Sequence, residues 1–235
     1  MIVFAMRPPS VLVLLALCVS FAAGPLGAQG FSFSQDAAKQ EAQDRAAEAA
    51  KQQRISELLS TPCRNDLKGK KIAVVIGEVQ SNGWIVAHWE NYGRHFQAIN
   101  TRLRALGLTT YTPEEIRRQI AQAEIDAYFR NDPDAALSAA RRLGASFMLR
   151  GLITGQSTFN PLVRVNQVSV NMGFTLTGAN GRIISNTEAS SASYAGADVA
   201  NMALTLVNEQ ADEVVAKLYS DYCRNAGLGA KPAPK

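Results

Sequence analysis

The chain has 235 residues, of which 47% are apolar and 19% are charged, and its formal net charge is +4. This length allows one domain with a proper core and some appendages. The basic residues are interspersed, and no arginine-rich stripe with interleaved aromatic residues occurs, which argues against nucleic acid as a partner.

The first 30 residues contain a charged region, an apolar region and a region of small residues, in the order that a secretory signal peptide has. A single positive charge, Arg7, precedes an apolar run from Val11 to Ala23, and small residues with a helix breaker follow. The run is too short to span a membrane comfortably. We therefore predict a cleaved signal peptide over residues 1–30, instead of an uncleaved anchor, and a periplasmic location.

Three cysteines occur in the chain, and each has a separate interpretation. Cys18 lies inside the apolar run behind the bulky Leu17, whereas a lipidated cysteine normally follows Gly, Ala or Ser, so we expect no lipid anchor there. Cys63 and Cys223 remain after signal removal. Because exported chains meet oxidising conditions, we predict a disulfide between them; the alternative is two free buried cysteines.

Residues 31–62 are rich in Ala, Gln, Glu and Lys, a composition that favours helix. Large apolar side chains are nearly absent there until Ile55, Leu58 and Leu59, so we predict a helical linker that buries little. A mixed α/β domain over 63–224 and a flexible tail over 225–235 complete the chain.

Within the domain we expect elements in the order β-α-β-α-α-β-β-β-α. The continuous β-branched run Ile72–Ile76 is typical of a strand buried on both faces. Apolar residues at helical spacing predict a helix from about Val86 to Leu106, ended by Gly107, before a short strand "LTTY". A parallel βαβ start is therefore expected.

The sequence of the second half of the domain predicts an antiparallel meander that helices cover. Thr112, Pro113 and Glu115 form a capping-box start for a helix that reaches about Phe129. A further helix is expected from Asp132, ended by Gly144. A strand over 146–158 and a turn over 159–161 lead into a second strand over 162–178, with a bulge at Asn166–Gln167. A hairpin turn over 178–181, a third strand and a long helix over Asp198–Cys223 follow.

No catalytic constellation is visible. The two histidines, His88 and His95, are seven residues apart on a predicted helix, or about 10 Å along its axis, which is too far for one ion. No G-x-S-x-G or H-E-x-x-H motif occurs. We predict no catalytic residue, no cofactor and no metal. If a small ligand binds, the loop over 78–84 is the expected place, because it follows a parallel strand.

Three segments carry a family resemblance: Ile72–Ile76, Leu143–Ile153 and Thr177–Ser185. Over about 70–223 the chain resembles a family of bacterial envelope proteins. The family includes the curli secretion-channel protein, the activator of penicillin-binding proteins and the N-terminal domain of the Tol–Pal β-propeller protein. The resemblance implies a non-enzymatic periplasmic assembly or scaffold protein, whose partners are other envelope proteins or further copies of itself.

Two alternatives remain open at this point. One is an activator that binds a peptidoglycan synthase, and the other is a small-ligand-binding or hydrolytic enzyme that uses the 78–84 loop. Trp84, Trp89 and Arg150 are the candidate interaction residues, because an exposed tryptophan or arginine can anchor an interface. After signal removal we expect no membrane-spanning segment.

Overall fold

The computed structural model describes residues 33–79, 85–87, 93–130, 132–195 and 198–225. The predicted signal peptide, Trp84, Trp89 and the tail beyond 225 lie outside these residues, as does most of the 78–84 loop. The chain divides into two compact units between Gln43 and Asp44. None of the helices in the described ranges is long and apolar enough to cross a membrane.

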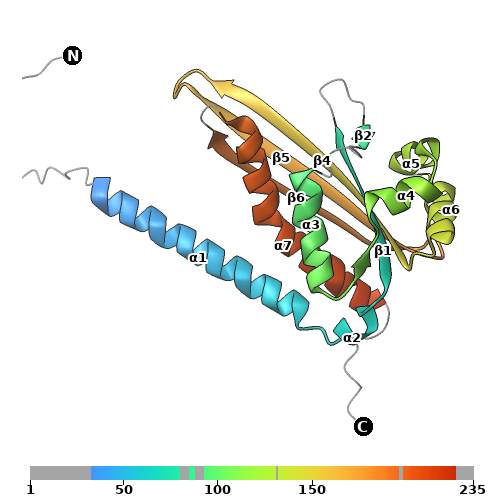
Figure 1. The fold of residues 1–235 in the computed structure, drawn as a ribbon. Helices are drawn as coiled ribbons and strands as arrows, with labels where there is room; N and C mark the ends of the chain where they lie inside the picture. Colours follow the sequence, from blue (N-terminus) through green and yellow to red (C-terminus); the bar gives the residue numbers. More distant parts are fainter. Residues whose placement is uncertain (1–32, 80–84, 88–92, 131, 196–197, 226–235) are drawn as a thin grey trace, which may run out of the picture. The chain divides into compact units, whose positions relative to one another are not determined.

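A six-stranded mixed sheet forms the centre of the second unit (Figure 1). Its order is β2-β1-β4-β5-β6, and β3 pairs with β1. β1 is parallel to β3 and β4, whereas the other neighbours are antiparallel, which confirms the mixed α/β class. The strands are β1 Lys71–Val79, β2 Ile85–Ala87, β3 Thr109–Thr110, β4 Phe147–Asn160, β5 Val165–Gly178 and β6 Ile183–Ala195.

Helices cover the two faces of the sheet unequally. One core lies between the sheet and α3 and α7, and a smaller core lies between the sheet and α4, α5 and α6 (Figure 1). Val74 of β1 faces the first core and Ala73 and Val75 face the second, as expected of a strand buried on both faces. The helices are α1 Phe33–Leu59, α2 Arg64–Leu67, α3 Arg94–Ala105, α4 Pro113–Gln119, α5 Gln122–Phe129, α6 Pro133–Leu143 and α7 Val199–Asn225.

The second half of α1, from Asp44 onward, belongs to the same compact unit as the sheet. Ile55 is buried, Lys51 donates a hydrogen bond to the backbone oxygen of Glu209 in α7, and the Arg54 Nε lies 3.3 Å from the Glu213 carboxylate. The end of the predicted linker helix therefore contacts the domain, although most of its side chains are exposed.

Two predicted helix boundaries are wrong. The predicted helix start at Val86 falls in β2, because Ile85–Ala87 pairs antiparallel with the end of β1, and α3 begins only at Arg94. The predicted helix from Thr112 to Phe129 is broken at Ile120, which is extended (ψ 126°) and buried. Tertiary contacts override the helical spacing in both places.

The predicted bulge at Asn166–Gln167 is also wrong. The β4–β5 register runs without a shift from Asn160↔Val165 to Phe147↔Gly178, and the one irregularity lies in the β5–β6 ladder at Leu176/Thr177. The preceding turn extends to Arg164, whose φ of 53° is left-handed. Val163 is thus a turn residue and does not belong to the strand alternation.

Other local predictions are confirmed. Thr112 and Glu115 form the capping box, and Gly144 ends α6 in the left-handed conformation with φ 62°. Gly151 lies in the interior of β4, where a Cβ atom would meet the Phe174 ring at 2.6 Å. The glycine lets this ring pack directly against the strand.

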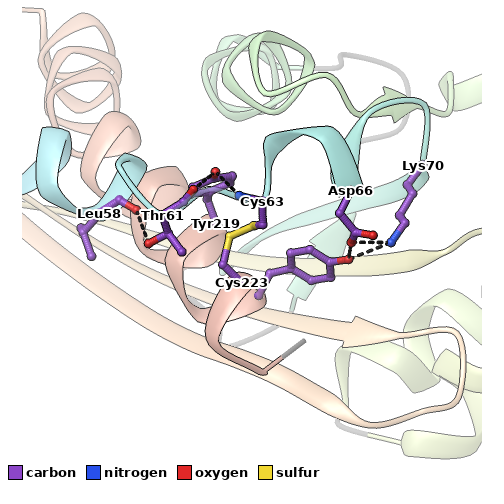
Figure 2. Close-up of a disulfide and its surroundings, with 8 residues drawn as sticks. Leu58, Thr61, Cys63, Asp66, Lys70, Tyr219 and Cys223 are labelled. Atoms are coloured by element: carbon purple, nitrogen blue, oxygen red, sulfur yellow. Dashed lines mark hydrogen bonds and ion pairs between the residues drawn. A yellow bond between two sulfur atoms is a disulfide. The ribbon is translucent and has the colours of Figure 1, made fainter. Parts of the chain in front are cut away.

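A disulfide joins Cys63, before α2, to Cys223 in the last turn of α7, across a sequence separation of 160 residues (Figure 2). The Tyr219 hydroxyl donates to the backbone oxygen of Thr61 and accepts from the backbone N–H of Cys63 at 3.3 Å. The end of α7 is therefore tied covalently and by hydrogen bonds to the segment that enters the sheet.

A charged cluster lies beside this disulfide. The Lys70 Nζ is 2.7 Å from the Asp66 carboxylate and 2.8 Å from the Tyr222 hydroxyl, which also donates to Asp66. Hydrogen bonds from Lys70 and then from Tyr222 lower the pKa of Asp66. These side chains have partners within the cluster, so we assign them a structural role.

Candidate docking surface

One face of the distal part of β4, β5 and β6 is covered by none of the helices in the described part of the chain. The register places Thr154 of β4 beside Asn171 of β5 and Ser190 of β6, on the side opposite to α3 and α7. The side chains of this face beyond Leu152 are exposed or half-buried. We call them the open face: Thr154, Gln156, Thr158, Gln167, Ser169, Asn171, Glu188, Ser190, Ala192 and Tyr194.

The open face follows from strict alternation in β5. Val168, Val170 and Met172 point into the core and are at most 2% exposed, so the residues between them must point outward. Hydroxyl, amide and small side chains dominate the outward set, and Glu188 carries its one charge. A shallow hollow of about 500 Å³ lies on this face, lined in part by Thr154, Asn171 and Glu188.

β6 is the last strand of the sheet, and no strand in the described part of the chain pairs with its outer side. It spans 13 residues, which is long for an edge strand. Natural proteins usually protect such an edge with lysine or proline. Residues 184–195 contain neither, and Glu188 is their one charged residue. An extended segment of another chain can therefore add to β6 through main-chain hydrogen bonds.

Arg150 lies where the covered part of the sheet meets the open face. Its Nη1 donates to the Tyr128 backbone oxygen at 3.3 Å, and its Nη2 donates to the Thr175 hydroxyl at 3.2 Å. Its guanidinium also lies over the Tyr128 ring, 5.9 Å from the centroid. Arg150 thus holds α5 against β4 and β5, and a role for it in partner binding stays a prediction. The other two candidates, Trp84 and Trp89, lie outside the described residues.

A second hollow, of about 590 Å³, lies between α3 and β3. Asn100 and Arg104 line it from α3 and Thr109 to Thr112 line it from β3 and the residues that follow, and no described lining residue is a histidine, a cysteine or a carboxylate. Across the described residues no group of three or more His, Cys, Asp or Glu side chains could hold a metal. The lack of catalytic residues, cofactor and metal stays a prediction.

No protein-family model and no curated protein matches this chain. Among solved structures it is similar to a PelC dodecamer from Paraburkholderia phytofirmans, at 15% identity and a TM-score of 0.37 over 64% of this chain and 89% of that chain. Lipoprotein GNA1162 from Neisseria meningitidis is 14% identical, with a TM-score of 0.38 over 62% and 97%. The LpoB C-terminal domain from Salmonella enterica is 16% identical, with a TM-score of 0.34 over 58% and 91%. Similarity this low is no basis for assigning a function.

Proposed function

We propose that this chain is a non-enzymatic assembly protein of the bacterial cell envelope, which works by self-association along β6. The observation that carries the proposal is the 13-residue edge of β6, with which no described strand pairs, next to the exposed polar side chains of the open face. A periplasmic location is supported by the signal-peptide pattern of residues 1–30 and by the family resemblance. The pair Cys63–Cys223 suits an oxidising compartment.

A second copy can pair with this edge without placing like charges directly opposite each other. Antiparallel pairing of two β6 strands about a two-fold axis at Ser191 would place Glu188 opposite Tyr194 of the second copy. Each carboxylate would then face a phenol hydroxyl instead of another carboxylate, which avoids the cost of like charges directly opposite. The small residues between them, such as Ser190 and Ala192, leave room for the second strand to approach.

Chemical cross-linking of the mature protein tests this proposal. Ala192→Cys places an exposed thiol on the open face beside the β6 edge, and a short bis-maleimide should join two copies through it. Ala123→Cys is the matched control, because Ala123 is equally a small, exposed residue but lies on α5.

The proposal predicts a cross-linked dimer with Ala192→Cys and little or none with Ala123→Cys. Equal yields from the two variants, or no dimer from either, would contradict self-association along β6. The yield of the Ala192→Cys dimer should fall when the protein is diluted before the cross-linker is added, because the non-covalent pair then dissociates.

A further inference from the structure

The turn between β4 and β5 carries an exposed apolar group. We call residues 159–164 the hairpin tip. Five large apolar or aromatic side chains of the described residues are strongly exposed, and three of them lie in this tip: Phe159 at 57%, Leu162 at 91% and Val163 at 57%. Exposed apolar residues scattered singly need no explanation, but a cluster at one projecting turn does.

The tip has a defined conformation. The β4–β5 ladder continues to its last pair, Asn160↔Val165. The Asn160 side-chain oxygen then accepts hydrogen bonds from the backbone N–H groups of Leu162 at 3.0 Å and Val163 at 3.4 Å. This Asx-type turn fixes the backbone from which Leu162 and Val163 project. In Figure 1 the β4–β5 hairpin extends past the first turn of α7.

The charged residues nearest to the tip in the sequence are all basic. Residues 135–187 contain no Asp or Glu, and the tip itself contains the exposed Arg164. The nearest carboxylate after β6, Asp198, accepts hydrogen bonds from the backbone and the side-chain amide of Asn201. The tip therefore presents apolar side chains with an adjacent positive charge and favours a negatively charged surface.

We propose that the hairpin tip binds the surface of a lipid bilayer that contains anionic phospholipid. Leu162 and Val163 would enter the boundary between headgroups and acyl chains, and Arg164 would contact a phosphate group. A protein partner fits less well, because a stable protein interface buries about 800 Å² on each side and a projecting six-residue turn is too small to supply that area. A bilayer needs no such area from a single turn.

Co-sedimentation of the mature protein with vesicles tests the proposal. The probes are vesicles of phosphatidylcholine alone and of phosphatidylcholine mixed in equal parts with phosphatidylglycerol. We expect binding to the mixed vesicles, with weaker binding at high salt. The double substitution Leu162→Ser/Val163→Ser should weaken the binding by roughly tenfold or more, because it removes the apolar side chains that enter the bilayer. Arg164→Gln should weaken binding to the mixed vesicles alone.

Ile183→Ser is the matched control, because Ile183 is a similarly exposed apolar residue (56%) outside the tip. It should leave binding unchanged. Circular dichroism of each variant checks that the sheet is retained. Wild-type protein that stays in solution with both kinds of vesicle would overturn the proposal, and so would a tip variant that binds as wild type does. Binding that Ile183→Ser weakens as much as the tip variant would also overturn it.

Discussion

At Gly151 the backbone of β4 packs directly against a core side chain. A Cβ atom at this position would lie 2.6 Å from Phe174 Cε1 and 3.1 Å from the Ile76 side chain. Phe174 is itself buried at 2% exposure, in a core where its ring has little freedom to move. The glycine is therefore required by packing, since its φ is not left-handed.

We expect Gly151→Ala to lower the free energy of unfolding by about 1–3 kcal/mol through overpacking. Gly155→Ala on the same strand is the matched control, because a Cβ atom there would meet nothing within 4 Å. Urea denaturation of the two variants measures the difference. Equal losses would mean that the Phe174 contact is not the cause.

Asp212 of α7 and Arg102 of α3 form a two-pronged ion pair. The Arg102 Nε and Nη2 lie 2.7 Å and 2.9 Å from the two carboxylate oxygens. The hydrogen bond from Arg102 lowers the pKa of Asp212 below its ordinary value of 3.8. The stabilising effect is therefore present above the ordinary pKa and is lost as the pH falls through the lowered pKa.

Asp212→Asn should reduce the free energy of unfolding at neutral pH by about 1 kcal/mol or less, because the aspartate is half exposed. Denaturation measured from pH 7 down to about pH 2 should show this difference shrinking toward zero, since both proteins then lack the charge. A difference that stays constant over this range would point to lost packing and not to the ion pair.

At the scale of elements, the end of α7 is held by the disulfide from Cys223 to Cys63. The bond closes a loop that contains the whole sheet, and the hydrogen bonds of Tyr219 and Tyr222 lie on either side of it. The disulfide reduces the number of conformations open to this long loop in the unfolded chain. It therefore raises the free energy of the unfolded state more than that of the folded state.

The chain-entropy treatment gives about 5 kcal/mol for a loop of this length, so the double substitution Cys63→Ser/Cys223→Ser should cost up to that amount. Reduction of the wild-type protein should cause a similar loss, and the reductant should leave the double variant unchanged. The oxidised mature protein should also be lighter by two hydrogen atoms in mass spectrometry. Two titratable thiols in the unreduced, unfolded protein would contradict the bond.

Elements with a strong local signal could be predicted from the sequence. The β-branched run of β1, the caps of α4 and α6 and the apolar face of α7 each specify their structure within a few residues. β2 could not be predicted, because three residues become a strand only through pairing with β1. Ile120 fits a helical spacing equally well, and its burial in an extended conformation depends on the packed core.

The docking surface was only partly visible in the sequence. Gln167, Ser169 and Asn171 alternate with core residues, which signals one solvent-facing side of β5. Which part of the sheet the helices leave uncovered is a property of the packing, and alternation alone does not reveal it. The apolar residues in "FNPLV" are a signal for the hairpin tip, but the strand predicted over 162–178 assigns Leu162 and Val163 to the sheet, because the left-handed turn residue Arg164 is not visible in the sequence pattern.

At the scale of the whole molecule, the second unit is asymmetric. Helices cover both sides of β1, but the distal parts of β4, β5 and β6 are covered on one side only. The β6 edge, with which no strand of the described residues pairs, and the open face adjoin each other there. Self-association would pair this edge and bury polar groups that an isolated chain leaves to water.

Self-association along β6 is tested most directly by the molar mass of the mature protein, measured by sedimentation velocity over a range of concentrations. We expect a mass above that of one chain at high concentration, and a single-chain mass for Ser190→Lys/Ala192→Lys, which places like charges on the facing strands. Ala123→Lys on α5 should behave as the wild-type protein does. A single-chain mass for the wild-type protein at every concentration, or an assembly that the β6 lysines leave intact, would contradict self-association along this strand.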